Sequence, residues 1–435
     1  MNYLIIGADA AGLSAANRIR SKTDGKITVI EKGRFISYAA CGMPYFIGDE
    51  IESYKALLGR SVEYFKKKNI DVITQTEALE IDRNNKIVYC KGQIDKAAYD
   101  KLLIATGAEP FIPPIRIDSK KVFTLKTIED AIRIKDFIKN NAPKKVAIIG
   151  AGAIGVEMAE QFGKIGLSVL MIERLPQILP IIDSDLAGVI QNYLTELGIE
   201  IKTGVSVESI EDFDKAVITS DAGRFSADFV LLSVGVKPNN KLAESAGVKL
   251  GYKGAIAVDR HMKTSDDSIY AAGDCAQTYH RLLGNRFVPL GTTANKQGRI
   301  AGLAMSGEDV RFSGVVGSAI LRCFDKSVAR SGIGVEQAAR ENIPVKSVTI
   351  KSGSKAHYYP TTQKMIMRIV FKDDGTIVGA QIVGGGAERI NTLAMAIAGS
   401  MKLDELYSQD FAYSPPFSPV WDPILVAAYE GLKKL

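Results

Sequence analysis

The start of the chain alternates between apolar runs and a glycine-containing turn. Residues 3–6 form a short apolar run, the turn Gly7–Gly12 follows, and an alanine-rich stretch separates it from a second apolar run at residues 27–30. This order predicts a strand, a helix and a second, parallel strand. Backbone N–H groups in such a turn can hold a pyrophosphate, and Glu31 after the second run can accept both hydroxyls of a ribose. Asp9 stands where the dinucleotide fingerprint has its middle glycine, which is a departure from that pattern.

The same pattern returns further along the chain, this time with all three glycines in place. An apolar run at residues 145–149 leads into the turn Gly150–Gly155, a helical stretch follows, and a further apolar run ends at Glu173. The spacing predicts a second dinucleotide-binding unit. A carboxylate at Glu173 would repel the 2′-phosphate of NADPH, so NADH is favoured, while the neighbouring Arg174 leaves the use of NADPH open.

Other apolar runs predict further strands. Those that end in small-residue turns suit the buried strands of a parallel sheet. The segment after about residue 315 differs, because an apolar run at residues 365–371 and a helical run near residues 390–400 predict a domain of strands and helices. The buried runs with their turns are 99–104 with Thr106 and Gly107, 228–234 with Gly235, and 268–272 with Gly273 and Asp274.

Composition and charge describe an ordinary globular chain. Its 435 residues suffice for about three domains of roughly 100–200 residues each. Lysines and arginines number 55 against 49 acidic residues, and their scatter indicates a solvated surface that attracts anionic nucleotides, rather than a nucleic-acid groove. No apolar run approaches the roughly 18 residues of a membrane span, and the first strand starts too early for a signal peptide. With four widely spaced cysteines, we expect a cytoplasmic protein.

One cysteine stands in an unusual setting. Cys41 lies in the segment Ser37-Tyr-Ala-Ala-Cys-Gly-Met-Pro-Tyr45, and Pro44 suits the first turn of a helix whose N-terminal end would include the thiol. A helix N-terminus favours the thiolate, which is the nucleophile in thiol–disulfide exchange. No second cysteine is near in sequence, so a disulfide formed by Cys41 would more readily involve a substrate sulfur. We expect the three other cysteines to be buried and inert.

These motifs, in this order, resemble those of the pyridine nucleotide-disulfide oxidoreductases. The segment around Cys41 is similar to that of the single-cysteine subgroup, which comprises CoA-disulfide reductases, NAD(P)H-dependent sulfur and persulfide reductases, and NADH oxidases and peroxidases. The resemblance implies an α/β fold with two Rossmann-like dinucleotide-binding domains, the NAD domain inserted in the FAD domain, and a C-terminal α+β dimerisation domain. The implied segments are 1–110 and 241–314 for FAD, 111–240 for NAD and 315–435 for dimerisation.

The resemblance also implies FAD in the first unit and NADH, with NADPH left open, in the second. A helix predicted over residues 289–302 would point its N-terminus at the flavin ring and stabilise negative charge there. We expect no metal site. The residues implied for FAD are Gly7, Ala11, Gly12, Glu31, Lys32, Ala78, Thr106, Gly107, Gly273, Asp274 and Ala294. Those implied for the pyridine nucleotide are Gly150, Gly152, Ile154, Gly155, Glu173 and Gly235.

The catalytic residues follow from the resemblance as well. Cys41 would carry the redox chemistry of sulfur. Tyr413, with Tyr358 as a second candidate, would reach it from the partner subunit of a homodimer and protonate a departing thiolate. Packing at a dimer interface is the alternative role of both tyrosines.

A CoA-type substrate is implied by three positions. Arg18, Ser37 and Lys68 match residues with which CoA-disulfide reductases bind the arms of CoA. Two positions depart, because some of those enzymes have asparagine and lysine where this chain has Ala40 and Trp421. The ending Ser-Pro-Val-Trp-Asp-Pro instead resembles the branch of the NAD(P)H sulfur oxidoreductases.

We therefore predict an FAD-dependent NAD(P)H oxidoreductase that reduces a low-molecular-weight disulfide, persulfide or polysulfide through Cys41, with CoA disulfide as the leading substrate. The alternatives are an NADH oxidase that passes electrons to oxygen and a reductase of a protein electron carrier. The peroxidases and water-forming oxidases of the subgroup usually have a histidine where this chain has Ala10, and we expect its three histidines to be exposed. No nucleic acid or membrane partner is expected.

Overall fold

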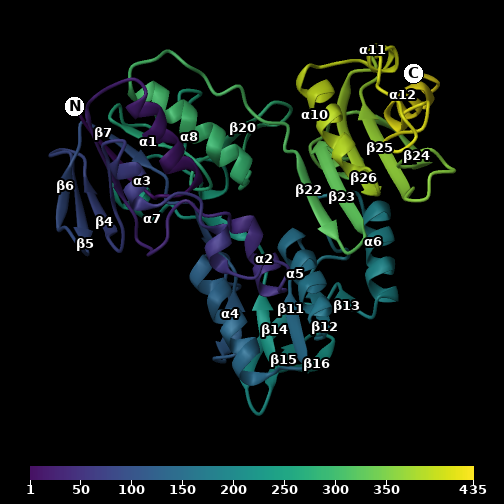
Figure 1. Cartoon of the computed structure of the whole chain (residues 1–435), viewed down its shortest axis with the longest axis horizontal. Coiled ribbons are helices and arrows are strands. Elements are labelled where there is room, and N and C mark those ends of the chain that lie inside the picture. Colours follow the sequence, from purple (N-terminus) through teal and green to yellow (C-terminus); the bar gives the residue numbers. More distant parts are fainter. The chain divides into compact units, whose positions relative to one another are not determined.

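The computed structural model describes all 435 residues (Figure 1). They form two compact units. Unit 1 comprises residues 1–111, 126–135 and 235–315. Unit 2 comprises residues 112–125, 136–234 and 316–435. Each unit contains a parallel sheet of the Rossmann type, which confirms the predicted fold class. The four predicted domain segments stay a prediction.

The core of unit 1 is a five-stranded parallel sheet with the strand order β19-β7-β1-β2-β3. Its central strand β1 comes from the first apolar run, and the residues from Tyr3 to Ile6 are all buried, as expected for a strand covered on both faces. Ile5 of β1 lies beside Val29 of β2 and Leu103 of β7. The strands span Ile269–Ala271 (β19), Lys101–Ile104 (β7), Asn2–Ile6 (β1), Lys26–Ile30 (β2) and Ile70–Ile73 (β3).

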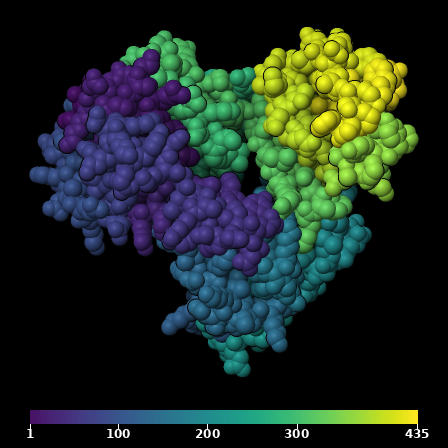
Figure 2. Space-filling model, viewed as in Figure 1, coloured from purple at the N-terminus to yellow at the C-terminus, as the bar shows by residue number.

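Two helices of unit 1, α1 (Ala10–Arg20) and α8 (Gly291–Met305), cross in close contact. A Cβ atom added to Gly298 would lie 2.1 Å from the carbonyl oxygen of Ala11, and one added to Gly302 would lie 2.5 Å from that of Ala15. Only glycine lets the two backbones approach so closely. In Figure 2 the purple atoms of the N-terminal segment border the green atoms of the segment near residue 300.

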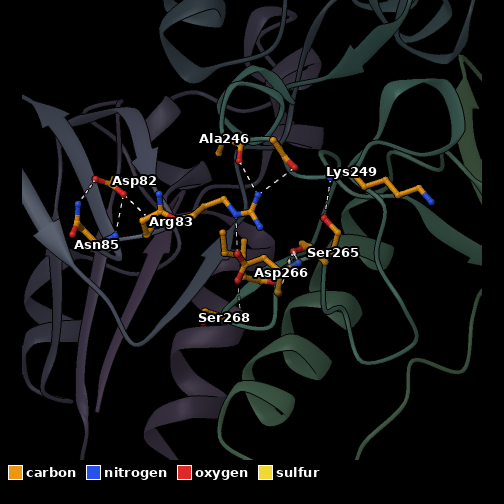
Figure 3. A network of polar contacts seen from close by, with 12 residues as sticks. Asp82, Arg83, Asn85, Ala246, Lys249, Ser265, Asp266 and Ser268 are labelled. Atoms are coloured by element: carbon orange, nitrogen blue, oxygen red, sulfur yellow. Dashed lines mark hydrogen bonds and ion pairs between the residues drawn. The ribbon is translucent and has the colours of Figure 1, made fainter.

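A polar network joins parts of unit 1 that the insertion separates in sequence (Figure 3). Arg83 lies between β4 (Glu77–Asp82) and β5 (Ile87–Lys91). Its guanidinium donates to Asp266 Oδ2 at 2.8 Å and to the carbonyl of Ala246 at 3.3 Å. The hairpin before the insertion and the loops after it therefore hold each other in place. The remaining elements of unit 1 are α2 (Met43–Ile47), α3 (Val62–Lys66), β6 (Lys96–Ala98), β8 (Ala108–Pro110), β18 (Val236–Pro238), α7 (Lys241–Ser245), β20 (Thr278–His280) and β21 (Gly284–Arg286).

The expected exposure of the histidines is wrong for His280. Its side chain lies in β20 with a relative exposure of 3%. The ring turns back onto its own chain, where Nδ1 accepts a hydrogen bond from the backbone N–H of Leu282 at 3.3 Å. This local partner satisfies a ring nitrogen and allows the imidazole to be buried.

Unit 2 begins with a second five-stranded parallel sheet, in the order β10-β17-β11-β12-β13. Its central strand again comes from an apolar run, with Val146 to Ile149 buried. The sheet strands span Val122–Thr124 (β10), Phe229–Leu232 (β17), Lys145–Ile149 (β11), Ser168–Glu173 (β12) and Glu200–Thr203 (β13). The accompanying elements are α4 (Ile128–Asn141, its start counted with unit 1), α5 (Ala153–Lys164), α6 (Ser184–Glu196), β9 (Arg116–Asp118), β14 (Val207–Asp212), β15 (Ala216–Ser220) and β16 (Gly223–Ala227).

A five-stranded antiparallel sheet completes unit 2, in the order β22-β23-β26-β25-β24. The strand predicted at residues 365–371 is β25, and the helical run near residues 390–400 is α10. The strands span Ala319–Cys323 (β22), Lys326–Gly332 (β23), Ile377–Gly384 (β26), Lys364–Phe371 (β25) and Lys346–Gly353 (β24), and the helices are α9 (Val335–Arg340), α10 (Ile390–Ala398), α11 (Leu403–Tyr407) and α12 (Pro423–Leu432).

Buried carboxylates connect the two sheets of unit 2. Glu160 on α5 accepts hydrogen bonds from Arg322 Nη2 and from the backbone N–H of Phe324, both at 2.8 Å. Asp183, before α6, accepts from Arg368 Nη1 on β25 at 2.9 Å. Because each acid is almost fully buried and paired, these contacts fix the second Rossmann sheet against the antiparallel sheet. None of the helices in either unit combines the length and the apolar character needed to cross a membrane.

Candidate functional site

The first glycine turn joins β1 to α1 in unit 1. Gly7 has a φ of +110°, and a Cβ atom added there would lie 2.2 Å from the carbonyl oxygen of Ala105. A Cβ atom added to Gly12 would lie 1.9 Å from the carbonyl oxygen of Gly7. Both glycines are thus required for the close approach of strand, turn and helix.

Glu31, at the end of β2, braces this turn from the side. Its Oε2 accepts from the backbone N–H of Ala8 at 2.8 Å, and its Oε1 accepts from the N–H of Gly33 at 2.7 Å. A carboxylate offers about four acceptor positions, so two remain for the hydroxyls of a ribose. The neighbouring Lys32 points elsewhere, because its side chain is 74% exposed and its ammonium pairs with Glu77 at 2.8 Å.

The second glycine turn, in unit 2, repeats this construction. Gly150 has a φ of +99°, and an added Cβ atom would lie 2.4 Å from the carbonyl oxygen of Ser233. One added to Gly155 would lie 2.2 Å from the carbonyl oxygen of Gly150, whereas one added to Gly152 would meet no atom within 4 Å. The predicted Ile154 is on the exposed side of α5, with a relative exposure of 41%.

Glu173 braces the second turn as Glu31 braces the first. Its Oε2 accepts from the backbone N–H of Ala151 at 2.7 Å and its Oε1 from that of Leu175 at 2.8 Å. Glu157 lies about one helical turn after Gly152, in α5. Burial and the nearby Glu160 raise its pKa to about 7. Glu157 is not among the residues predicted for the site.

The ends of β7 and β19 complete the surroundings of the first turn. A Cβ atom added to Gly273 would lie 2.9 Å from the Cβ of Ala11 and 3.6 Å from that of Ala294, so these three predicted residues meet. Gln297, fully buried on α8, accepts from the backbone N–H of Gly273 at 2.9 Å. Asp274 faces Lys126, with 3.5 Å between its Oδ2 and the lysine Nζ.

Thr106 and Gly107 follow β7. The hydroxyl of Thr106 donates to the carbonyl of Asn239 at 2.6 Å, and Gly107 has a φ of +70° with open space around its Cα. Gly235 opens the return segment of unit 1 and has a φ of +103°. Ala78 lies in β4 beside Cys90 of β5.

Cys41 is exposed and lies in a short 3₁₀ turn, Ala40–Gly42, directly before α2. Pro44 is in the first turn of α2, as predicted. The segment leading to Cys41 is bonded to the first glycine turn, because the backbone N–H of Ser37 donates to the carbonyl of Ala8 at 3.0 Å. The three other cysteines are buried, as predicted.

A basic pocket of about 350 Å³ lies between α1, α3 and α8 of unit 1. It brings the predicted Arg18 and Lys68 together. Arg60 and Lys68 lie on the ring of Tyr64, each 4.7 Å from its centroid, and the hydrogen bond from Lys68 lowers the pKa of the phenol. Four cations and no acid line this pocket, so it attracts anions. Its lining residues are Ser14, Asn17, Arg18, Arg60, Tyr64, Lys68, Asn295 and Arg299.

Ser37 connects the pocket with the cysteine segment. Its Oγ accepts from the backbone N–H of Arg60 at 3.3 Å, and its carbonyl accepts from the N–H of Gly59 at 2.6 Å. The φ of Ser37 is +49°, a left-handed conformation that is uncommon for residues other than glycine. This strained residue is thus held on one side by the glycine turn and on the other by the pocket.

The two predicted tyrosines are neighbours in unit 2. Tyr413 and Tyr358 are hydrogen-bonded to each other, and this bond raises the pKa of the Tyr413 phenol. Both rings are exposed. The pair therefore presents phenolic hydroxyls at the surface of the antiparallel-sheet domain.

Comparison with known proteins assigns the chain to a family. The profile of the pyridine nucleotide-disulphide oxidoreductases matches residues 1–298, and the profile of their dimerisation domain matches residues 319–423. The chain belongs to the pyridine nucleotide-disulphide oxidoreductases. FAD and a pyridine nucleotide are the cofactors of this family, and the predicted class of enzyme is confirmed.

Relatives among the pyridine nucleotide-disulphide oxidoreductases span the whole chain. An NADH oxidase of Methanocaldococcus jannaschii is 39% identical, over 100% of this chain and 99% of that protein. An NAD(P)H sulfur oxidoreductase (CoA-dependent) of Pyrococcus furiosus is 34% identical, over 98% of each chain. The solved structure of an NAD-dependent persulfide reductase from A. fulgidus has a TM-score of 0.96 and 40% identity, and the match covers 100% of this chain and 83% of that one.

The residues present fit the cofactors of a pyridine nucleotide-disulphide oxidoreductase. At Gly107 and Gly152 the open space around the backbone admits a close ligand, whereas a Cβ atom at the first or third glycine of either turn would meet backbone atoms. In unit 1 the first turn with Glu31 would hold the adenosine and pyrophosphate part of FAD. Lys126 and Gln297 lie beside the predicted Asp274 and Gly273, and no pattern along the sequence indicates either of them.

Proposed function

We propose that this oxidoreductase reduces CoA disulfide, or a CoA persulfide, with NADH through Cys41. The observation that carries the proposal is the basic pocket of unit 1. It is joined through Ser37 to the segment of Cys41, so one ligand could place phosphates in the pocket and a sulfur near the thiol. CoA combines these features, since it has a phosphorylated ADP at one end and a thiol at the other. The name of the relative from Pyrococcus furiosus, which is CoA-dependent, supports the same substrate class.

The reaction of Cys41 with a disulfide would proceed in two steps. The Cys41 thiolate attacks one sulfur of CoA disulfide, forms a mixed disulfide and releases the first CoA thiolate. FAD, when bound, supplies two-electron transfer between a pyridine nucleotide and sulfur. Two electrons from NADH then cleave the mixed disulfide, which restores the Cys41 thiolate and releases the second CoA thiolate. One NADH and one proton thus convert one CoA disulfide into two CoA thiols.

Tyr413, with Tyr358 as a second candidate, would donate a proton to the departing CoA thiolate from the partner subunit of a homodimer. The matched dimerisation domain and the exposed apolar side chains of the C-terminal segment support such an assembly. Among those side chains Phe417 is 75% exposed and Val420 is 68% exposed. We infer a cytoplasmic location, because an exposed catalytic thiol must stay reduced and the cytoplasm is a reducing compartment.

The role of Cys41 is tested with the variant Cys41→Ser. We expect it to retain FAD, because the side chain lies outside the glycine turn, and to lose at least about a thousandfold in anaerobic turnover of CoA disulfide. Unchanged turnover in the FAD-loaded variant would disprove the mechanism.

The role of the pocket is tested by comparing CoA disulfide with pantethine, which has the same thiol arm without the nucleotide. Lys68→Gln and Arg299→Gln should each raise KM for CoA disulfide about tenfold and leave KM for pantethine unchanged, because each removes one phosphate contact. Lys66→Gln is the matched control, since Lys66 is an exposed lysine of α3 outside this pocket. Equal effects on both disulfides would place the phosphates elsewhere.

A second candidate function is an NADH oxidase, favoured by the name of the relative from Methanocaldococcus jannaschii. The two candidates differ in the electron acceptor. NADH consumption is therefore measured anaerobically with CoA disulfide, polysulfide or CoA persulfide, and separately in air-saturated buffer alone. A sulfur-dependent rate well above the oxygen rate supports the reductase, and the reverse supports the oxidase.

A further inference from the structure

Asp9 marks the position at which the first glycine turn differs from the second. Asp9 and Gly152 each stand directly before a helix, α1 or α5, two positions after the first glycine of their turn. At Gly152 no atom lies within 4 Å of an added Cβ. In dinucleotide-binding units the pyrophosphate lies at this helix end. The first turn therefore presents a carboxyl group where the second presents open space.

Asp9 does not make the usual capping hydrogen bond of a residue that precedes a helix. Its carboxylate accepts from the backbone N–H of Tyr38, in the segment that leads to Cys41, and from the N–H of Ala10 at the start of α1. The charged groups that act on it are Glu31, which repels it, and Lys126, which attracts it. Lys126 is shared, since its Nζ lies 3.5 Å from Asp274.

The neighbouring elements add no further cation. Lys32, next to Glu31, is paired with Glu77. On the other side the phenol of Tyr38 is surrounded by acids, and besides burial and the two acids of the turn, Glu129 and Asp130 raise its pKa. The carboxyl group thus lies in an acidic environment with one shared lysine.

A pyrophosphate brings two more negative charges to this position. Burial, together with a smaller contribution from Glu31, raises the pKa of Asp9 to about 6. A protonated carboxyl group would relieve the repulsion and could donate a hydrogen bond to a phosphate oxygen. We propose that Asp9 takes up one proton from solvent when FAD binds, so that the first turn holds the pyrophosphate with a neutral acid and releases FAD more readily as the pH rises.

The direction of the pH dependence follows from the two states. Below about pH 6 the carboxyl group is protonated before FAD binds, so the affinity does not change with pH. Above this value binding must draw a proton from solvent, and Kd for FAD rises by up to about tenfold per pH unit until the pKa of the complex is reached. This behaviour concerns FAD alone and is independent of the sulfur substrate.

The test uses the full-length chain, stripped of FAD and titrated with FAD between pH 5.5 and pH 9, with flavin fluorescence as the readout. The wild-type Kd should rise at least about tenfold between pH 6 and pH 8. Asp9→Asn keeps the shape without the charge, and Asp9→Gly restores the fingerprint, so both should bind FAD with little pH dependence in this range. Asp24→Asn is the control that should keep the wild-type slope, because Asp24 is a fully exposed acid after α1 and lies outside the turn.

A second measurement decides the question even where a variant does not fold. Calorimetric titration of the wild-type chain with FAD at pH 7.5, in two buffers of different ionisation enthalpy, gives the number of protons taken up. Uptake of between about half a proton and one proton per FAD supports the proposal. No uptake in the wild type, or equal uptake in Asp9→Asn, would overturn it.

Discussion

The two glycine turns of this oxidoreductase share a frame but differ at its centre. In both turns the first glycine has a positive φ, the third contacts the carbonyl of the first, and a glutamate accepts from two backbone N–H groups. At the middle position, φ is −125° for Asp9 and −74° for Gly152, values open to any residue. The backbone of the turn therefore does not require glycine at the middle position.

The largest expected effect comes from replacing the third glycine of each turn. Gly12→Ala and Gly155→Ala each force a Cβ atom onto a backbone carbonyl oxygen, at 1.9 and 2.2 Å, which costs about 3 kcal/mol or more. We expect Gly12→Ala to lose FAD, whereas Gly155→Ala keeps FAD and loses binding of NADH. Visible absorbance of bound flavin and NADH titration measure the two outcomes.

Gly188→Ala is the matched control for both variants, because a Cβ atom at this helical glycine of α6 meets nothing within 4 Å. It should retain both cofactors. Full FAD content in Gly12→Ala with an unchanged melting temperature would show that the first turn tolerates a side chain at this position. The third glycine would then not be required in both turns.

Replacing the glutamate that accepts hydrogen bonds from each turn should have the next largest effect on cofactor binding. Glu31→Gln and Glu173→Gln each replace a charge-assisted acceptor by an amide, which costs about 1–3 kcal/mol. Glu173 is more deeply buried than Glu31, so we expect the larger loss in the second turn. The Kd for FAD in the first variant and for NADH in the second measure it, and equal losses would remove burial as the explanation.

Exchange of the middle position should have a moderate effect. Gly152→Asp places a carboxyl group in the open space of the second turn, next to Glu173, and should weaken NADH binding about tenfold at pH 8 and less at pH 6. Gly152→Asn is its neutral counterpart and should show no such slope. A Gly152→Asp variant with pH-independent NADH binding would mean that the side chain turns away from the ligand.

The smallest expected effect concerns stability. Burial and Glu160 raise the pKa of Glu157 to about 7 from 4.5, so the folded protein binds a proton more tightly than the unfolded chain. The free energy of unfolding therefore decreases as the pH rises from about 4.5 to 7. Glu157→Gln removes this pH-dependent decrease, so the variant should be more stable than the wild type at pH 8 but not at pH 4.5. We expect a difference of about 1 kcal/mol at pH 8, because solvent screens this partly exposed group. Chemical denaturation at both pH values measures it.

Local parts of the site could be predicted because each lies within one short pattern. The strands, the turn glycines and both glutamates follow from apolar runs and spacing. The resemblance supplied pairs that the fold brings together, such as Arg18 with Lys68 and Tyr358 with Tyr413. Their roles in catalysis and binding stay predictions.

The remaining residues of the site depend on contacts between distant segments. Arg299 joins Arg18 in the basic pocket only because α8 packs on α1. Lys126 reaches Asp274 from the start of the insertion, where no motif surrounds it. The resemblance implies Lys32 for FAD, yet Glu77 of β4 pairs with its charge. A single sequence contains no pattern that pairs such positions.

The crossing of α1 and α8 has a consequence for biosynthesis. The strands of the second Rossmann sheet lie between residues 122 and 232, so a nascent chain has all of them once this stretch has left the ribosome. Helix α1 is made first, but Gly298 and Gly302, against which it packs, follow much later. Domains usually fold in the order of synthesis. In this chain unit 1 is begun first and completed after the inserted sheet.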